Sequence, residues 1–185
     1  MTKAKIDQSF RTAQSKIVRR SELARIISDA KAQGKTVVFT NGCFDLLHVG
    51  HVRYLEQARS MGDMLVVGVN SDESVTRLKG QGRPLVSEFE RLEVLAALEC
   101  VDWVTLFAED TPVELIEAIR PDTHVKGGDY KIEDLPEAEV MKRLGARVVI
   151  IPYSSTRTEG CSSSDLLDRM TKAANQEARE CTSDG

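Results

Sequence analysis

Five short apolar runs are spaced along the chain, with longer segments of helical periodicity between them. The runs are rich in Val and Ile and do not alternate with polar residues, a pattern typical of strands buried on both faces. We predict strands at 36–40, 64–70, 101–107, 122–126 and 146–152. Helical patterns lie near 50–61, 87–99, 111–119, 136–144 and 163–174. This alternation predicts an α/β fold, a doubly wound parallel five-stranded sheet with helices on both faces.

A further amphipathic helix is predicted over 21–33, ahead of the first strand. Its apolar residues recur on one helical face, as expected for a helix that packs on a core. Ser21 is the predicted N-cap, and Gly34 is the predicted C-terminal stop.

The composition favours one globular domain. Of the 185 residues, 41% are hydrophobic and 29% are charged, which is ordinary for a soluble protein. We assign the domain to 21–172. Residues 1–20 and 173–185 are polar and show no clear period, so we predict a polar N-terminal extension and a polar C-terminal tail.

Charge and cysteine content exclude several classes of protein. The formal net charge of −4 argues against a dedicated nucleic-acid binder, although a few local cations can still attract a small anionic substrate. No apolar run is long enough to cross a bilayer, and the first residues lack the apolar core of a signal peptide. The four cysteines form no C-x-x-C pair, which argues against a secreted disulfide framework. We therefore expect a cytoplasmic protein that binds neither nucleic acid nor membrane.

In a doubly wound sheet, ligands bind beyond the carboxyl ends of the strands. The stretch N-G-C-F-D-L-L-H-V-G-H follows the first predicted strand and precedes a predicted helix. His48 and His51 are three residues apart and share a face on a first helical turn, and Gly50 lets a ligand approach the backbone. A helix N-terminus favours anions, so this stretch predicts phosphoryl or nucleotidyl transfer.

Three other interpretations of this stretch are open. In the first, the two histidines have only a structural role, partly buried and hydrogen-bonded near a helix start. Alternatively, they would bind zinc with Cys43 as a third ligand, but the spacing fits none of the common zinc patterns. Cys43 would act as a nucleophile only with a partnered base, and small buried cysteines are common.

The loops after the other strands add cations, glycines and hydroxyls. K-G-G-D-Y (126–130) places Lys126 and two glycines where a nucleotide can lie against the backbone, or it forms a tight turn with a solvated lysine. L-K-G-Q-G-R-P (78–84) is either a solvated linker or a flap that folds Lys79 and Arg83 over a triphosphate. Arg91 is a third candidate cation, or it pairs at the surface with Glu88 or Glu90.

The segment R-T-E-G-C-S-S-S ends in hydroxyls just ahead of the last predicted helix. Ser162, Ser163 or Ser164 would cap that helix, bind phosphate, or do both.

Taken together, these motifs resemble a known superfamily. N-G-C-F-D-L-L-H-V-G-H resembles the G-x-F-D-x-x-H-x-G-H signature of the cytidylyltransferase-like nucleotidyltransferases, and T-E-G-C-S-S-S resembles their second motif. Over roughly 35–170, the segments L-K-G-Q-G-R-P, A-L-E-C-V-D-W-V, E-D-T-P, V-K-G-G-D-Y and E-G-C-S-S-S resemble the adenylyltransferase domain of the ADP-heptose synthesis enzymes.

The resemblance implies a Rossmann-like nucleotidyltransferase fold and a reaction. AMP from ATP would be joined to D-glycero-β-D-manno-heptose 1-phosphate, giving ADP-heptose and pyrophosphate for lipopolysaccharide core biosynthesis. It also implies Mg²⁺ bound with ATP and a homodimer. The R-T-E-G lead-in is similar to glycerol-3-phosphate cytidylyltransferases, which makes an alcohol-phosphate cytidylyltransferase that uses CTP the alternative. A nucleotide-sensing module without activity is the alternative from another class.

The resemblance also implies a role for each candidate residue. The expected catalytic residues, which act on the triphosphate and its transition state, are His48, His51, Lys79 and Arg83. The expected nucleotide-binding residues are Gly42, Cys43, Phe44, Gly50, Arg91, Gly127, Gly128, Asp129, Ser162, Ser163 and Ser164. The expected sugar-phosphate-binding residues are Asp45, Asn41 and Lys126. No side chain is assigned to a metal ion.

Overall fold

The computed structural model describes residues 11–128, 130–152, 166–173 and 176. Five parallel strands form one sheet in the order β3-β2-β1-β4-β5. The strands are β1 (Val37–Gly42), β2 (Met64–Asn70), β3 (Trp103–Phe107), β4 (Thr123–Gly127) and β5 (Arg147–Ile151). Each coincides with one of the five predicted runs, so the parallel five-stranded sheet is confirmed.

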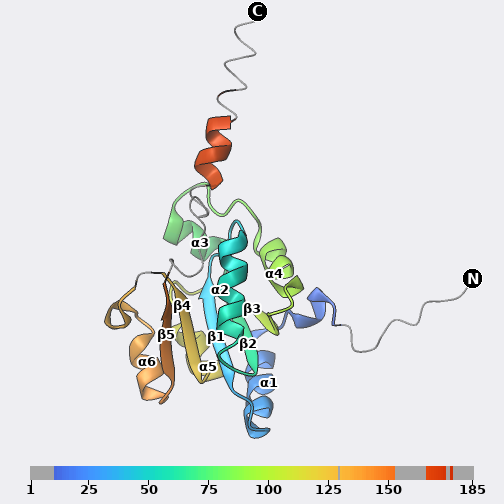
Figure 1. The fold of residues 1–185 in the computed structure, drawn as a ribbon, viewed down its shortest axis with the longest axis vertical. Helices are drawn as coiled ribbons and strands as arrows, with labels where there is room; N and C mark the ends of the chain where they lie inside the picture. Colours follow the sequence, from blue (N-terminus) through green and yellow to red (C-terminus); the bar gives the residue numbers. More distant parts are fainter. Residues whose placement is uncertain (1–10, 129, 153–165, 174–175, 177–185) are drawn as a thin grey trace, which may run out of the picture.

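Helices cover both faces of the sheet, as predicted (Figure 1). One face is covered by α2 (Val49–Arg59) and α4 (Glu88–Ala97), whose apolar residues belong to one core cluster. The other face is covered by α1 (Arg20–Ala32), α5 (Val113–Ile119) and α6 (Ala138–Arg143), which share a second cluster.

Burial on both faces explains the unbroken apolar runs. Val37 and Phe39 belong to the cluster beneath α1 and α5, whereas Val38 between them belongs to the cluster beneath α2. All three are 0–1% exposed, because successive side chains of a strand point to opposite faces and both faces are covered.

The strand order places the switch point of the sheet between β1 and β4. From β1 the chain continues through β2 to β3 on one side, and then crosses to β4 and β5 on the other. Loops that leave neighbouring strands in opposite directions open a crevice at their carboxyl ends. The crevice is therefore expected beside Asn41 and Gly42, the last two residues of β1.

Helix α3 (Asp72–Lys79) was not predicted, because it has eight residues, of which only Ser74 and Val75 are buried, and its amphipathic pattern is short. The predicted start of the first helix is wrong. Helix α1 begins at Arg20 with Arg19 as its N-cap residue, so Ser21 lies inside the first turn and is not the cap. Gly34 has φ +78° just beyond the helix, which confirms it as the C-terminal stop.

Part of the predicted N-terminal extension packs on the domain. A 3₁₀ turn, η1 (Ala13–Lys16), precedes Ile17, which forms a parallel bridge with Val104 of β3. Lys16 Nζ donates to two backbone carbonyls near the start of β3, those of Leu98 (3.1 Å) and Val101 (2.9 Å). Residues 11–20 are therefore attached to the sheet edge and do not form a free extension.

Two further elements complete the described chain. A 3₁₀ turn, η2 (Ile132–Asp134), lies between β4 and α6. Residues 166–173 are helical, within the range predicted for the last helix. Among the helices of the described residues, none is both long and apolar enough to cross a membrane.

Candidate active site

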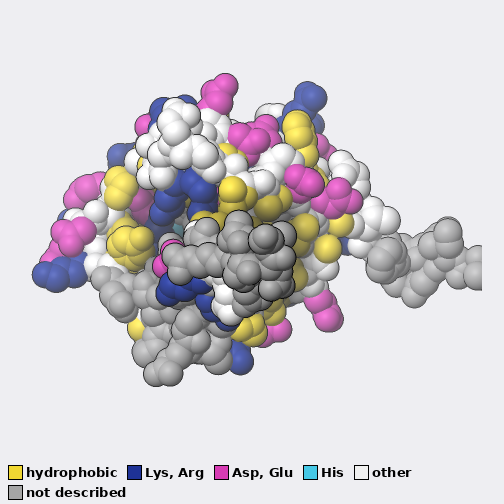
Figure 2. Space-filling view, turned by 90° about the horizontal axis from the view of Figure 1, so that it is seen from above, with side chains coloured by type: hydrophobic (Ala, Val, Ile, Leu, Met, Phe, Trp, Pro, Cys, Tyr) yellow, Lys and Arg dark blue, Asp and Glu magenta, His cyan; other side chains and the backbone are white. Residues whose placement is uncertain are grey.

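A cavity of about 800 Å³ opens at the carboxyl ends of β1 and β4, where the topology places the crevice. Its lining comes from six segments: the end of β1 with the start of α2, the end of β2, the end of α3 with the loop after it, the loop before α5, the end of β4 and the loop before α6. Seen from above, Lys and Arg side chains gather around a hollow in this face (Figure 2). A net negative protein therefore presents a locally cationic site, which suits an anionic ligand.

The β1–α2 turn has a backbone conformation that shapes one wall of the cavity. Phe44 has φ +48°, a left-handed conformation that is uncommon for a residue with a side chain. A Cβ atom at Gly42 would lie 3.1 Å from the Phe44 ring, so the glycine makes room for this turn. The Phe44 ring packs against the His51 ring with their centroids 5.4 Å apart. Gly42, Phe44 and Gly50 all line the cavity, as predicted.

His48 and His51 lie together at the start of α2, as their spacing predicted. His48 is the N-cap residue, and its Nδ1 accepts a hydrogen bond from the Gly50 N–H (3.1 Å). The His48 N–H in turn donates to Nδ1 of His51 (3.4 Å), and the two ring centroids are 4.0 Å apart. Because each Nδ1 is an acceptor, the neutral rings carry their proton on Nε2, which is a donor for phosphate oxygens. Both side chains line the cavity.

The end of α3 and the loop after it bring two cations to the cavity, and Asp45 holds the loop. Lys79, the last residue of α3, and Arg83, on the loop, both line the cavity. Asp45 is 5% exposed, and its Oδ1 accepts hydrogen bonds from the N–H groups of Leu85 (2.7 Å) and Val86 (3.0 Å). Its Oδ2 lies 2.5 Å from Nε of Arg83. Both carboxylate oxygens are thus engaged by the loop.

Arg91, predicted to support the phosphates, lies beneath the cavity and is not among the residues that line it. It is 1% exposed and donates to the backbone oxygens of Cys43 (2.5 Å), Asn70 (2.8 Å) and Val86 (3.0 Å). Its Nη2 also donates to Oδ1 of Asp72 (2.7 Å). Arg91 joins three segments that border the cavity and pairs with no surface glutamate of its own helix.

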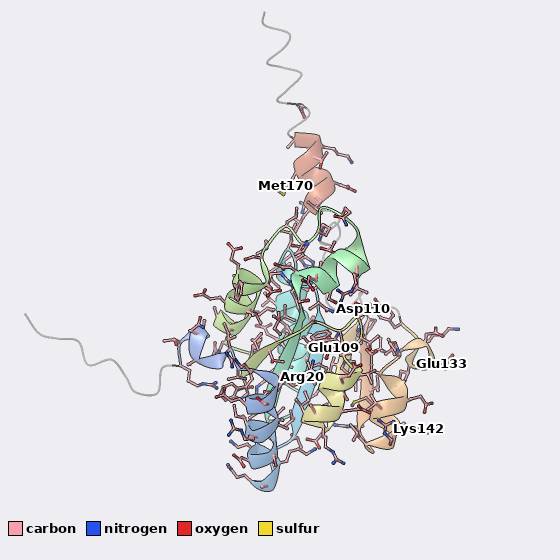
Figure 3. All side chains as sticks on the ribbon, turned by 180° about the vertical axis from the view of Figure 1, so that it is seen from behind. Arg20, Glu109, Asp110, Glu133, Lys142 and Met170 are labelled. Carbon is pink, nitrogen blue, oxygen red and sulfur yellow. The ribbon has the colours of Figure 1, made fainter. Side chains whose placement is uncertain are left out.

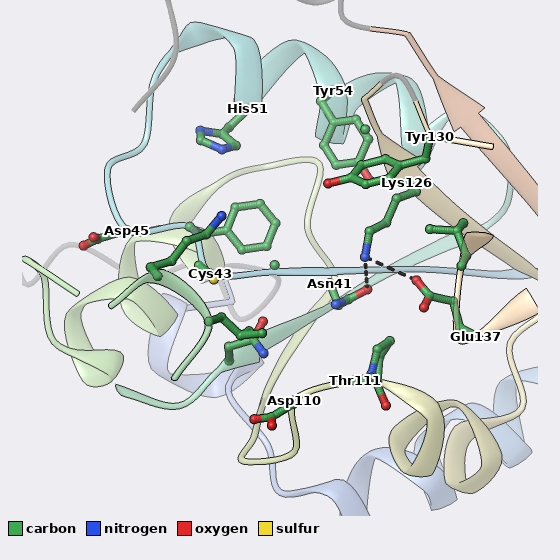
Figure 4. A pocket seen from close by; sticks show the side chains of 18 of the residues that line it. Asn41, Cys43, Asp45, His51, Tyr54, Asp110, Thr111, Lys126, Tyr130 and Glu137 are labelled. Carbon is green, nitrogen blue, oxygen red and sulfur yellow. Dashed lines mark hydrogen bonds and ion pairs between the residues drawn. The ribbon is translucent and has the colours of Figure 1, made fainter. Parts of the chain in front are cut away.

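Asn41 and Lys126 meet at the opposite end of the cavity from Asp45 (Figure 4). Lys126 Nζ lies 3.2 Å from Oε1 of Glu137 and 3.5 Å from Oδ1 of Asn41. The three residues predicted to bind the sugar phosphate are therefore divided, with Asn41 and Lys126 together and Asp45 apart. Glu137 is 1% exposed and was not predicted, because an isolated glutamate in E-D-L-P-E belongs to no motif.

A buried histidine completes this end of the site. His124 Nε2 lies 3.2 Å from Oδ1 of Asn41, and the His124 ring stacks on Phe39. Burial, and then the Lys126 charge, lower the pKa of His124 to about 3. The ring is therefore neutral near pH 7, and its approach to Glu137 Oε1 (3.8 Å) is not an ion pair.

The β4 end packs closely on α2. A Cβ atom at Gly127 would lie 3.0 Å from the Tyr54 ring, so only glycine fits there without a shift. The Tyr54 hydroxyl is hydrogen-bonded to Thr40 Oγ1 (2.6 Å) and donates to the Val125 oxygen (2.8 Å). Gly127 lines the cavity, whereas Gly128 is buried and donates to the Ile151 oxygen (2.9 Å). Tyr54 also lines the cavity and was not predicted.

The loop between β3 and α5 forms a further wall that the sequence analysis noted without assigning residues. Asp110 and Thr111 line the cavity there. Two ion pairs fix the loop, Arg20 with Glu109 (2.5 Å) and Arg77 with Asp110 (2.8 Å). Arg20 and Glu109 are seen from behind in Figure 3. The E-D-T-P motif was the signal for this wall.

The remaining candidates concern a nucleophile, a metal ion and residues outside the described part of the chain. Burial raises the pKa of Cys43, which keeps its thiol protonated although it lines the cavity. Within the described residues, no group of three or more His, Cys, Asp and Glu side chains is arranged to hold a metal ion. Asp129 and Ser162, Ser163 and Ser164 lie outside the described residues.

Comparison with known proteins assigns this arrangement to a family. The family model described as cytidylyltransferase-like matches residues 39–169. "Bifunctional protein HldE" of Geobacter sulfurreducens is 52% identical over 155 residues, which are 84% of this chain and 31% of that protein. The protein of the same name from Pseudomonas paraeruginosa is 58% identical over 130 residues, 70% of this chain and 27% of its own length. The chain thus spans about a third of the length of these curated relatives.

Solved structures show the same fold. The lipopolysaccharide core biosynthesis protein from Thermoplasma volcanium superposes with a TM-score of 0.55 at 32% identity, covering 64% of this chain and 97% of that one. Pantoate-beta-alanine ligase from Francisella tularensis, in complex with beta-gamma ATP and beta-alanine, gives a TM-score of 0.52 at 13% identity, covering 74% of this chain and 66% of that one. This second likeness concerns the fold alone.

Proposed function

The chain belongs to the cytidylyltransferase-like family, and from that membership we propose that it is a heptose-phosphate adenylyltransferase. It joins AMP from ATP to D-glycero-β-D-manno-heptose 1-phosphate, giving ADP-heptose and pyrophosphate for lipopolysaccharide core biosynthesis. The motifs that resemble ADP-heptose synthesis enzymes support this substrate. The substrate is also supported by the sequence identity of about half to the HldE proteins and by the structural similarity to a lipopolysaccharide core biosynthesis protein.

One observation carries the proposal: two histidines at a helix start face the same cavity as two cations, one at the end of α3 and one on the loop after it. His48 and His51 sit at the N-terminus of α2, and Lys79 and Arg83 line the same cavity. A triphosphate bound there meets imidazole donors, a helix N-terminus and two positive charges. Such an arrangement stabilises the charge that develops as pyrophosphate leaves.

The reaction needs no covalent enzyme intermediate. In the proposed step, an oxygen of the sugar 1-phosphate attacks the α-phosphorus of ATP in line, and the bond to the pyrophosphate oxygen breaks. The protonated thiol of Cys43 supports direct transfer, since it is a poor nucleophile. Asn41 and Lys126 are placed to hold an anionic group at the β4 end of the cavity, and Gly127 to lie against the nucleotide.

Mg²⁺ belongs to the proposal as a partner of ATP. Three of the four described carboxylates that line the cavity are engaged by cations, Asp45 by Arg83, Asp110 by Arg77 and Glu137 by Lys126, whereas Asp134 is exposed. This donor set fits an ion that is held mainly by triphosphate oxygens and water, as Mg²⁺ is in many phosphoryl-transfer sites. The ion would neutralise charge on the leaving pyrophosphate.

We further propose that the protein works in the cytoplasm as a homodimer. The described cysteines Cys43 and Cys100 are free thiols, which suits a reducing compartment. Light scattering on the purified protein measures the dimer directly, and a monomer at micromolar concentration would contradict it.

A pyrophosphate-release assay tests the proposed function. ATP and CTP are each combined with heptose 1-phosphate, mannose 1-phosphate and glycerol 3-phosphate in the presence of Mg²⁺. We expect release with ATP and heptose 1-phosphate at a rate well above every other pair. Release that requires CTP and glycerol 3-phosphate would establish the alcohol-phosphate cytidylyltransferase instead. Nucleotide binding without turnover on any acceptor would favour a sensing module.

A further inference from the structure

The loop that carries Arg83 is free at its tip and fixed at its far end. We call residues 80–86 the cation loop. Gly80 (φ +94°) and Gly82 (φ +86°) are exposed, and a Cβ atom at either would meet nothing within 4 Å. The two glycines give this tip a large conformational freedom. A cation on such a loop needs another restraint to face a ligand.

Thr76 Oγ1 of α3 donates to the backbone oxygen of Arg83 (2.7 Å), and further restraint comes from the β1–α2 turn. Asp45 Oδ1 accepts hydrogen bonds from two consecutive backbone N–H groups of the cation loop, those of Leu85 and Val86. The Val86 oxygen accepts from Arg91, which also donates to the Cys43 oxygen two residues before Asp45. The far end of the loop is thus bound to the turn from two sides.

The second oxygen of Asp45 faces the guanidinium itself. Oδ2 lies 2.5 Å from Nε of Arg83, and the two side chains are 3% and 21% exposed. Neither atom makes an aligned hydrogen bond within the described residues, so the pair is held by charge and enclosure. Contact through Nε engages the inner part of the guanidinium, and the terminal nitrogens supply the N–H donors that bind phosphate.

We propose that Asp45 is a positioning residue that acts through Arg83. One carboxylate oxygen anchors the cation loop and the other directs the guanidinium of Arg83 toward the triphosphate in the cavity. Asp45 does not contact the acceptor, because both of its oxygens are engaged and its side chain is enclosed. Holding the cation before the ligand arrives lowers the ordering cost of binding. This inference rests on the proposed function for the identity of the triphosphate.

Two substitutions separate the two oxygens. Asp45→Asn keeps an oxygen that can accept from Leu85 and Val86 but removes the charge beside Arg83. Asp45→Ala removes both the acceptor oxygen and the charge. Asp63→Asn is the matched control, since Asp63 also accepts a backbone N–H, from Thr36 (2.9 Å), at the amino ends of β1 and β2 and away from the cavity.

The loop anchor is tested without any enzyme assay. Trypsin cleaves after Lys79, and the rate of that cut in the folded protein is followed by mass spectrometry. We expect Asp45→Ala to be cut at least several times faster than the wild type, and both Asn variants to be cut at the wild-type rate. An unchanged rate in Asp45→Ala would overturn the anchoring role.

The direction of Arg83 is tested by nucleotide binding. Calorimetry with MgATP, and with MgCTP if that binds instead, gives the dissociation constant. We expect Asp45→Asn and Arg83→Ala each to weaken binding by roughly tenfold, the effect of one charge-assisted hydrogen bond. The double variant should bind no more weakly than Arg83→Ala alone, because Asp45 acts through Arg83. Additive losses would overturn the proposal.

Steady-state kinetics separates this inference from the proposed function. In Asp45→Asn, we expect the KM for the acceptor to stay within a factor of about two of the wild-type value, since both carboxylate oxygens of Asp45 face the cation loop. A raised acceptor KM with unchanged ATP binding would show that Asp45 contacts the acceptor and would overturn the inference. Triphosphate binding that depends on Asp45 as described, without transfer to any acceptor, would overturn the proposed function and leave the role of Asp45 standing.

Discussion

Lys126 Nζ lies 3.2 Å from Oε1 of Glu137, and this ion pair joins the end of β4 to the residue that precedes α6. The glutamate is 1% exposed, whereas the lysine side chain is 21% exposed and lines the cavity. Asn41 Oδ1 lies 3.5 Å from the same ammonium group. The lysine is thus held at the cavity wall by a buried carboxylate and an amide before any ligand binds.

Removing the carboxylate should cost stability as well as position. We expect Glu137→Ala to lower the free energy of unfolding by about 1–3 kcal/mol, less than for a fully buried pair because Lys126 reaches water. Glu137→Gln keeps a hydrogen-bond acceptor and should lose less. Urea denaturation measures both variants. Glu139→Gln, in an exposed position of α6, is the control and should change stability by less than about 0.5 kcal/mol.

The two histidines at the start of α2 combine a cap with the proposed chemistry, and two substitutions separate these roles. Asn is a favourable N-cap residue, so His48→Asn should retain the thermal stability of the protein and still lose turnover. His51→Ala removes the reciprocal acceptor as well, which we expect to cost about 0.5–2 kcal/mol. Turnover in both variants should fall by roughly 100-fold or more, as for the loss of an electrostatic stabiliser of the transition state.

Circular dichroism melts and pyrophosphate release measure the two effects separately. Near-normal pyrophosphate release by His51→Ala would contradict the assignment of His51 as a catalytic residue. A large loss of stability in His48→Asn would show that the imidazole has a structural role beyond the cap.

Hydrophobic patterning predicted the fold because the strands are buried on both faces. An uninterrupted run such as M-L-V-V-G-V-N coincides with β2, from Met64 to Asn70. The short helix α3 escaped because most of its residues face solvent and its amphipathic pattern rests on two positions. Patterning thus finds elements that bury a whole face and misses those that bury one or two residues.

The rule that ligands bind at the carboxyl ends of strands predicted most of the described cavity. It located His48 and His51, which lie in the segment after β1, and Lys126, which lies at the end of β4. It did not find the place of Arg91, whose acceptors on Cys43, Asn70 and Asp72 are brought to it by tertiary packing. Glu137 was not predicted, because its partner Lys126 is eleven residues away on another element.

The buried histidine His124 should make stability depend on pH. Its pKa is lowered from 6.5 to about 3 by burial and then by Lys126, so the folded state stays unprotonated while the unfolded state binds a proton below pH 6.5. The free energy of unfolding should therefore decrease as pH falls from 6.5 toward 3. Unfolding takes up at most about one proton at this residue, so the unfolding equilibrium constant rises by up to about tenfold per pH unit.

Asn41, Lys126 and Glu137 are the polar and charged groups closest to this ring. His124→Gln removes the titration while keeping an amide that can bond to Asn41. Urea midpoints from pH 7 to pH 5 should fall more steeply in the wild type than in this variant. Parallel slopes would contradict the lowered pKa.

The last prediction separates a structural from a ligand-binding role for Arg91. Its guanidinium donates to three backbone oxygens and one carboxylate while only 1% exposed, so truncation leaves several buried acceptors unpaired. We expect Arg91→Ala to lose about 3 kcal/mol of stability, mainly because buried backbone oxygens lose their donor, whereas the Asp72 side chain is 40% exposed and adds little. Arg91→Lys should lose a substantial part of this, because an ammonium group cannot reproduce the planar fork. Arg53→Ala, at an exposed position of α2, is the control and should stay within about 0.5 kcal/mol. If Arg91 instead bound the phosphates, Arg91→Lys would fold with wild-type stability and bind MgATP more weakly, and urea denaturation beside calorimetry distinguishes the two results.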